Sequence, residues 1–491
     1  MRSSRTASAG NTRSERPEAR VPIPDPNHWS RELAPHLRAH RWILASEAVA
    51  ASTKRAELLR EWGAREILCV GVNRGVGDEP RDKGFGQFIV GGPAVSGLQA
   101  SIRAAEQIFT SPPAELQAVV DEFDPDGTAL VLAAAFSGAG AYFGRPIFGA
   151  REPAWRALED KVVIDRVFEE AGIKVAPHRI VPARRDALLV AAMEVDRGEG
   201  TVWAGDAREG FHGGAEFTCW IRDDDDVEDA LARLAPHCDS ARVMPFLEGV
   251  PCSIHGWVLP DHVAAFRPCE MLVLRSARPP AFRYMSVATV WDPPSADREA
   301  MRSIARQMGA HLRDQYGYRG SFSIDGVMTR DGFLPTEINP RCGAAMPALM
   351  AGVPGFPTEL LHFASVERLP IDWRGRDLEE LVVSTADACR SAGFSCFGCR
   401  PPGTELQFAL VRDPDWRLAT EADAALPQSK GSYGRATFGG MLRVGFDPAQ
   451  LAIGRSAAPM VAEVFAMLDR QLDLGVGTLA PARDVRAGLG S

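Results

Sequence analysis

Continuous apolar runs alternate with helical patterns in the first third of the chain. Residues 65–73 (REILCVGVN) and 128–136 (TALVLAAAF) are such runs, and each ends in a glycine-containing loop. Runs of this length and composition are typical of strands buried on both faces, as in a parallel sheet covered by helices. The pattern therefore predicts a small α/β domain with a parallel sheet over residues 29–150.

In the middle of the chain, strand-like segments alternate with two helical patterns. One helix is predicted over residues 155–171, ending before Gly172, and a longer one over residues 297–314. Two apolar strands around residues 320–341 are separated by the turn sequence TRDG, which predicts a hairpin. The apolar stripe of the longer helix consists of Met301, Ile304, Ala305, Met308 and Leu312.

Beyond residue 365 the pattern changes to short strands and one last helix. Strands are predicted within residues 379–388, 405–412 and 436–446, and the helix carries apolar residues over 460–468. We expect a third, α+β domain over residues 366–491, after a middle region over 151–365. Residues 1–28 combine arginines with small residues and lack an apolar stretch, so a disordered tail is expected rather than a secretory signal.

Composition narrows the possible classes of protein. The 491 residues carry a formal net charge of -9, which disfavours a general nucleic-acid binder. No apolar run approaches the length of a membrane span. Nine scattered cysteines do not suggest a disulfide framework, and the single C-x-x-C pair, Cys396 and Cys399, is interpreted as reduced thiols rather than half of a zinc site. We expect a cytoplasmic protein.

The candidate chemistry lies on the second strand of the hairpin. Glu337, Asn339 and Arg341 are spaced two apart and so face the same side of a strand. The hairpin brings Asp325 beside them from the first strand. Two carboxylates and an amide oxygen suit Mg²⁺, and Arg341 would lie next to the metal, where it could hold phosphate or carboxylate. The alternative is that these charges only decorate an exposed hairpin.

In these two strands and in three further segments, the sequence resembles the ATP-grasp superfamily over about residues 150–360. The segments are ALEDK (157–161), AREGFHGG (207–214) and RVMPFLEG (242–249), in the family's order. The resemblance implies an ATP-grasp fold, in which two α+β subdomains grip ATP. It further implies ATP and Mg²⁺, or Mn²⁺ in its place, as cofactors, with the metal held by Asp325, Glu337 and Asn339. The implied nucleotide contacts are Lys161, Gly210, Gly213, Gly214, Pro245, Phe246, Leu247 and Glu248.

The sequence departs from the family pattern at two positions. A second lysine is common on the strand before the glycine-rich loop, but Trp203 and Ala204 stand there. Met244 replaces an acidic residue often found at the adenine hinge. We expect Arg208 or another basic group to compensate for the missing lysine.

Two arginines are predicted to be catalytic by this resemblance. Arg341 is expected beside the metal. Arg267 is expected on a strand facing the metal site, where it would hold the acyl phosphate or the substrate carboxylate, although a surface arginine is an equally weighted interpretation. Arg275 and Arg278 are further candidates in the loop that follows.

The resemblance implies an ADP-forming ligase that activates a carboxylate as an acyl phosphate and joins it to an amine. The narrower resemblance is to pheganomycin-type peptide ligases of specialised metabolism, which use amino-acid-like carboxylates and peptide amines. An aminoacyl–carrier-protein ligase and an inactive ATP-binding regulator are the alternatives. The expected partners are these small molecules, without nucleic acid or membrane, and a homodimer is a candidate assembly.

Overall fold

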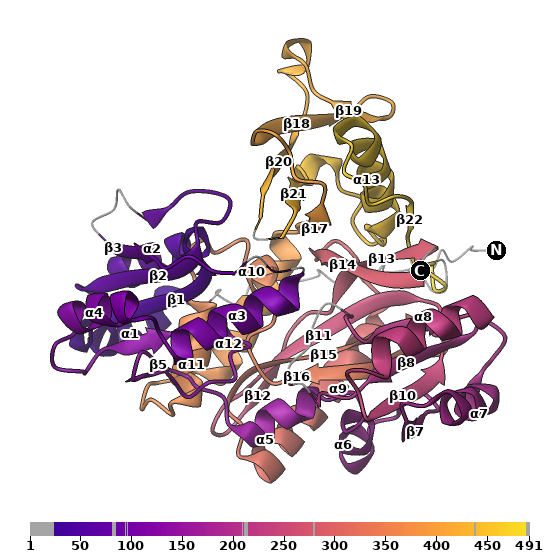
Figure 1. Ribbon diagram of the computed structural model, residues 1–491, viewed down its shortest axis with the longest axis horizontal. Helices are drawn as coiled ribbons and strands as arrows, with labels where there is room; N and C mark the ends of the chain where they lie inside the picture. Colours follow the sequence, from indigo (N-terminus) through magenta and orange to yellow (C-terminus); the bar gives the residue numbers. More distant parts are fainter. Residues whose placement is uncertain are drawn as a thin grey trace, which may run out of the picture.

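A computed structural model describes residues 24–80, 85–93, 95, 97–208, 210, 215–277, 280–436 and 438–487, so most of the expected tail at 1–28 lies outside the described residues. The N-terminal part contains the predicted parallel sheet, and its strands lie in the order β3-β2-β1-β4 (Figure 1). The predicted run 128–136 forms a strand only at β4, and β1 was not predicted. The elements are α1 (Asn27–Ala39), β1 (Trp42–Ala48), α2 (Thr53–Glu61), β2 (Ile67–Asn73), β3 (Gly86–Ile89), α3 (Leu98–Thr110), α4 (Ala114–Phe123), β4 (Leu130–Leu132), β5 (Ala141–Tyr142) and β6 (Arg145–Pro146).

The second sheet is small and antiparallel, in the order β7-β10-β8-β9, with two helices packed on it (Figure 1). The acidic run that begins at Asp223 starts a helix, as expected, and the Asp223 side chain accepts a hydrogen bond from the Asp226 backbone NH (3.1 Å). The elements are β7 (Arg179–Pro182), α7 (Arg185–Val195), β8 (Thr201–Gly205), β9 (Thr218–Ile221), α8 (Asp224–Leu234) and β10 (Ser240–Pro245).

The third sheet follows the path β14-β13-β11-β15-β16 and carries the predicted hairpin and long helix. Ile324 and Ile338 are fully buried in one apolar cluster with Met301, Ala305 and Met308 of the helix α9. Because side chains alternate along a strand, the neighbours of these isoleucines must face the opposite side. The elements are β11 (Val250–Val258), β12 (Val263–Ala265), β13 (Cys269–Ala277), β14 (Pro280–Ala288), α9 (Ser295–Tyr316), β15 (Gly320–Thr329), β16 (Gly332–Asn339) and β22 (Leu479–Ala480).

The helix predicted over residues 155–171 is interrupted. It consists of α5 (Pro153–Arg156), a 3₁₀ turn η3 (Ala157–Glu159) and α6 (Ile164–Glu170). Asp160 breaks the pattern because its Oδ1 accepts a hydrogen bond from the Val162 backbone NH (3.0 Å), which competes with helical bonding. The interruption places Lys161 in a turn.

The strand predicted over residues 379–388 is wrong, because this segment belongs to the helix α12 (Gly375–Ala388). Its buried residues recur with the helical spacing, which the sequence interpretation overlooked: Leu378, Leu381, Val382, Thr385 and Ala386. Together with α10 (Met346–Leu349) and α11 (Thr358–Val366), this helix shares an apolar core with the N-terminal part of the chain.

The fourth sheet forms the C-terminal α+β part, drawn in orange and yellow in Figure 1. It is antiparallel in the order β17-β21-β20-β18-β19, and it packs with the predicted final helix. The elements are β17 (Gly393–Cys399), β18 (Leu406–Arg412), β19 (Trp416–Leu418), β20 (Ser429–Arg435), β21 (Gly440–Gly445) and α13 (Ala458–Leu472). The predicted fold class is confirmed: a parallel α/β part, two antiparallel α+β units and a C-terminal α+β part. No described helix is both long and apolar enough for a membrane span.

A buried carboxylate joins the third sheet to the C-terminal part. Glu270 of β13 accepts hydrogen bonds from the Ser456 hydroxyl (2.5 Å) and from the backbone NH of Ala457 (2.7 Å), at the start of α13. Burial raises the pKa of Glu270 to about 7, although these hydrogen bonds act in the opposite direction.

Replacement of Glu270 by Gln should remove one pH-dependent part of the free energy of unfolding. The folded-state pKa lies above that of the unfolded chain, so the folded protein binds this proton more tightly and loses stability as pH rises from about 4.5 to about 7. Urea denaturation across this range should show the stability of wild type falling relative to Glu270→Gln, with a constant difference at higher pH. The control is Glu463→Gln, at an exposed position of α13, the helix whose start Glu270 contacts. The stability of this variant should differ from that of wild type by an amount that does not change with pH. A pH-independent difference for Glu270→Gln would contradict the expectation.

Candidate active site

Two carboxylates face each other across the hairpin. Asp325 of β15 is in register with Glu337 of β16. The Ser253 hydroxyl donates to Asp325 Oδ1 (2.6 Å), and the Asn339 amide donates to Asp325 Oδ2 (2.9 Å). Burial, and then the negative charge of Glu337, raises the pKa of Asp325 to about 6. The structure thus brings together Asp325, Glu337 and Asn339, as predicted from the strand spacing.

Lys161 supplies a positive charge to this pair. From its turn between η3 and α6, its ammonium group forms an ion pair with Glu337 Oε2, and both side chains are largely buried. Burial opposes ionisation of Glu337, but the attraction of Lys161 outweighs it and lowers the pKa of Glu337. The two carboxylates therefore differ in proton affinity, because the ion pair with Lys161 dominates at Glu337, whereas burial and the charge of Glu337 dominate at Asp325.

Arg341 is fixed by a carboxylate that the sequence interpretation missed. Its Nε donates to Glu159 Oε1 (2.9 Å) and its Nη2 donates to Asn339 Oδ1 (2.7 Å). Glu159 Oε1 also accepts from Arg151 Nη1 (2.7 Å). Glu159 stands two residues before Lys161 in the segment ALEDK, which is the signal that could have identified it.

The oxygen donors at this site fit a hard divalent cation. In the described part of the chain, no group of three or more His, Cys, Asp or Glu side chains is placed to hold a metal. The candidate ligands are two half-buried carboxylates and the amide oxygen of Asn339, which has a second lone pair beside its bond to Arg341. A cation between Asp325 and Glu337 would offset their repulsion, so the residues present suit Mg²⁺.

A pocket of about 220 Å³ opens beside Lys161 and Glu337, and we call it the apolar pocket. The predicted hinge residues Phe246 and Leu247 line it, whereas Pro245 does not. Phe246 stacks on Trp220, with ring centroids 4.2 Å apart and planes at 15°, and lies nearly parallel to Phe282. The apolar pocket is lined by Lys161, Val202, Ala215, Thr218, Arg242, Met244, Phe246, Leu247, Pro251, Met271, Val273, Arg275, Phe282, Gly326, Val327, Thr336 and Glu337.

Glu248, also predicted at the hinge, is held by two arginines. Arg275 donates to both of its oxygens (2.9 Å each), and Arg483 adds its backbone NH (3.1 Å) and its Nε (3.0 Å). Burial would raise the pKa of Glu248, but Arg275 and Arg483 lower it to about 2. Arg275, a candidate from the sequence, thus joins the hinge to the wall of the apolar pocket.

Arg242 is the basic residue nearest the missing lysine. On β10 it is in register with Ala204 of β8, and it lines the apolar pocket. Its Nη1 donates to the Thr336 carbonyl (2.8 Å) and to Asp165 Oδ2 (3.2 Å). The structure does not bring Arg208 to this pocket, because its guanidinium donates to Asp239 and to the Pro236 carbonyl.

A second pocket of about 420 Å³, which we call the polar pocket, lies on the other side of Glu337. Glu337 lines both pockets. Gly210 lines the polar pocket, while the predicted Gly213 and Gly214 lie outside the described residues. The polar pocket is lined by Ile102, Arg103, Glu106, Phe136, Gly138, Arg151, Pro153, Arg156, Ala157, Glu159, Asp160, Ala207, Gly210 and Glu337.

The structure does not bring Arg267 to the carboxylate pair. Arg267 lies in the connection between β12 and β13 rather than on a strand, so its predicted strand position is wrong. Arg267 lies outside the strand ladder and forms ion pairs with Asp292 (2.6 Å) and Asp387. Arg278, the remaining sequence candidate, lies outside the described residues.

Comparisons with known proteins find similar folds only. No family model and no curated protein matches the chain. A similar solved structure is N5-carboxyaminoimidazole synthase from Aspergillus clavatus with ADP and 5-aminoimidazole ribonucleotide: 11% identity, TM-score 0.49, covering 89% of this chain and 99% of that one. The corresponding synthetase from Thermotoga maritima has 13% identity, TM-score 0.46 and coverage of 90% and 99%. A third similar structure is the biotin carboxylase domain of Hydrogenobacter thermophilus 2-oxoglutarate carboxylase, with MgADP and bicarbonate. It has 12% identity and a TM-score of 0.49, and the match covers 90% of this chain and 91% of that one. Function has to be argued from the residues themselves.

The ion pair between Asp165 and Arg242 should contribute strongly to stability. Both side chains are buried, so Asp165→Asn leaves the Arg242 charge without its carboxylate and should lower the free energy of unfolding by about 3 kcal/mol. Glu169→Gln removes a charge from the exposed side of the same helix α6 and is the matched control, expected to change stability by less than about 0.5 kcal/mol. Urea denaturation of both variants tests this, and equal stabilities would contradict it.

Proposed function

We propose that the chain is an ATP-grasp ligase that uses ATP and Mg²⁺, releases ADP and joins a carboxylate to an amine. The observation that carries the proposal is the position of Glu337, which lies in the wall of both the apolar and the polar pocket. A phosphate chain entering from one pocket and an acid entering from the other would meet at this residue. Fold alone does not give this function, so the proposal rests on the site.

In this proposal the apolar pocket holds the nucleotide. The nearly parallel rings of Phe246 and Phe282 line this pocket and offer an apolar surface for adenine, and Trp220 stacks on Phe246. Lys161 and Arg242 stand at the polar end, where they would bind phosphate oxygens. Asp325, Glu337 and Asn339 would hold Mg²⁺, which when bound supplies positive charge to the transferred phosphoryl group.

The polar pocket holds the acid in the same proposal. An oxygen of the substrate carboxylate bonds to the γ-phosphorus while the bond from that phosphorus to the ADP oxygen breaks. The amine nitrogen then bonds to the acyl carbon, phosphate leaves and the amine gives up a proton. Arg341, held by Glu159 and Asn339, is placed to bind the phosphoryl or carboxylate oxygens during both steps, and no side-chain nucleophile is needed.

The substrate class is proposed to be amino-acid-like, with a peptide or amino-acid amine as acceptor, as in peptide ligases of specialised metabolism. The polar pocket supports this because it presents both signs of charge to one cavity. Arg103, Arg151 and Arg156 suit a carboxylate, and Glu106 and Asp160 suit an ammonium group.

Loss of the Glu337 carboxylate, which lines both pockets, should slow turnover strongly. ADP release is measured with ATP, Mg²⁺ and panels of amino acids, peptides and carrier proteins. Glu337→Gln should lower the rate by about 10²–10³, because a charge that positions the metal and phosphates is removed. Asp331→Asn in the exposed turn of the same hairpin is the control and should retain the rate.

Other outcomes of this assay select the alternatives. ADP release only with a phosphopantetheine thiol as acceptor would overturn amide formation and support a carrier-protein ligase. ATP binding without ADP release under any condition would support an inactive regulator.

Arg242 should act in nucleotide binding through its charge. Arg242→Met should raise the KM for ATP by roughly tenfold, since one charged hydrogen-bond donor to phosphate is lost. Arg242→Lys restores the charge beside Ala204 and should recover most of the affinity. Equal KM values for wild type and Arg242→Met would exclude this role.

A further inference from the structure

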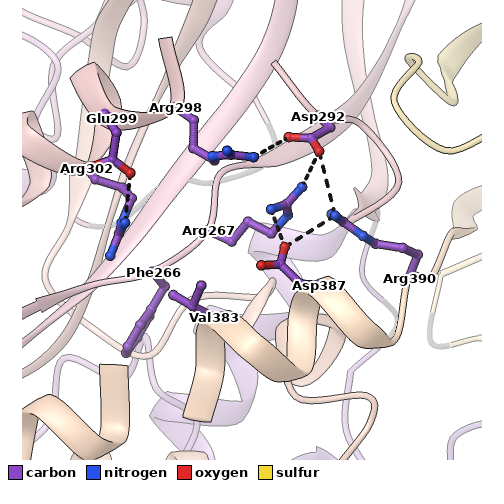
Figure 2. Close-up of a pocket in the computed structure, with 9 residues that line it drawn as sticks. All are labelled: Phe266, Arg267, Asp292, Arg298, Glu299, Arg302, Val383, Asp387 and Arg390. Atoms are coloured by element: carbon purple, nitrogen blue, oxygen red, sulfur yellow. Dashed lines mark hydrogen bonds and ion pairs between the residues drawn. The ribbon is translucent and has the colours of Figure 1, made fainter. Parts of the chain in front are cut away.

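A third pocket, of about 390 Å³, surrounds Arg267 and shares no lining residue with the two pockets described above. Figure 2 shows its side chains coming from the β12–β13 connection, the segment before α9, the first turns of α9 and the end of α12. We call it the arginine pocket. It is lined by Phe266, Arg267, Asp292, Arg298, Glu299, Arg302, Val383, Asp387 and Arg390.

Two arginines of the arginine pocket lie deeper than two of its carboxylates. The side chains of Arg267 and Arg390 are only 3% and 10% exposed. Those of Asp387 and Glu299 are 48% and 58% exposed. Arg267 and Arg390 therefore form a cationic floor below Asp387 and Glu299, while Arg298 and Asp292 are about equally exposed, at 32% and 28%.

Arg267 is the central group of this floor and is not fully satisfied. Its Nη1 pairs with Asp387, and its Nη2 lies 2.6 Å from Asp292 Oδ2 without hydrogen-bond geometry. Its buried Nε has no hydrogen-bond partner among the described residues. A buried donor without a partner costs free energy, which a ligand oxygen would recover.

Two neighbouring arginines can reach the same ligand. The only ion pair of Arg298 among the described residues is with Asp292 (3.1 Å). Arg390 donates to the Thr289 carbonyl (2.8 Å) and to Asp387 Oδ1 (3.3 Å), and burial and then the charge of Arg267 lower the pKa of Arg390. Arg302 is less available, because Glu299 and Glu379 already bind it.

We propose that the arginine pocket binds a small molecule through a phosphate dianion, at a site separate from the proposed nucleotide and acid sites. Guanidinium groups converging from three elements supply more donors than one planar carboxylate can accept, whereas the three terminal oxygens of a phosphate can accept them. The volume admits a small organic molecule, and Phe266 and Val383 offer apolar contact to its carbon part. The proposal does not depend on the ligase activity.

Isothermal titration calorimetry of the full chain with inorganic phosphate, at constant ionic strength, tests this site. Wild type should show one saturable site that Lys161→Gln retains. Arg298→Gln and Arg390→Gln should each weaken it by roughly tenfold. Arg267→Lys keeps the charge between Asp292 and Asp387, so the fold is maintained, but it lacks the Nε fork and should weaken binding as well.

The control is Arg313→Gln, which removes the same charge from the same helix α9 outside the pocket and should bind phosphate like wild type. Wild-type affinity in both Arg298→Gln and Arg390→Gln would overturn the proposal. So would loss of binding in Lys161→Gln alone, because phosphate would then occupy the nucleotide site. Equal affinity for acetate and phosphate would overturn the assignment to a phosphate dianion.

Discussion

The register of one hairpin forces two carboxylates together, and the rest of the site is arranged around that repulsion. Asp325 and Glu337 stand opposite each other because Ile324 and Ile338 are buried against α9 on the other face. A slip of one residue would exchange the two faces and bury the charges in the core. The hydrophobic core thus fixes a polar arrangement that would be unfavourable by itself.

The compensating cations come from elements far apart in the chain. Lys161 comes from the turn before α6, Arg242 from β10, and Arg341 from the end of the hairpin itself. Glu159 links Arg341 to Arg151, so the carboxylate pair belongs to a network in which most charges touch an opposite one. Such networks keep their geometry because removal of one member leaves a buried charge without a partner.

Period-two spacing in the sequence was sufficient to put Glu337, Asn339 and Arg341 on one face. The pairing of Asp325 with Glu337 also needs the shift of register between Asp325 and Gly326, because continuous pairing from the turn would place Asp325 opposite Thr336. The sequence also led to the expectation that Arg208 or another basic group compensates for the lysine missing near Ala204. It could not identify Arg242, because that choice depends on how β10 aligns with β8. The predicted strand position of Arg267 is wrong for a different reason. Arg267 lies in the connection between β12 and β13, where the alternation of side chains along a strand no longer applies. Over residues 379–388 the β-branched residues suggest a strand, and in so short a segment they obscure the helical spacing of the apolar residues.

The charged cluster of Glu248, Arg275 and Arg483 at the hinge combines residues that are synthesised at very different times. Glu248 and Arg275 are in the middle of the chain, whereas Arg483 lies next to β22, which adds to the edge of β13. Synthesis proceeds from the N-terminus, so Arg483 is made after every residue that lines the apolar pocket. A nascent chain can therefore hold the whole lining of the pocket before Arg483 completes the ion pairs of Glu248.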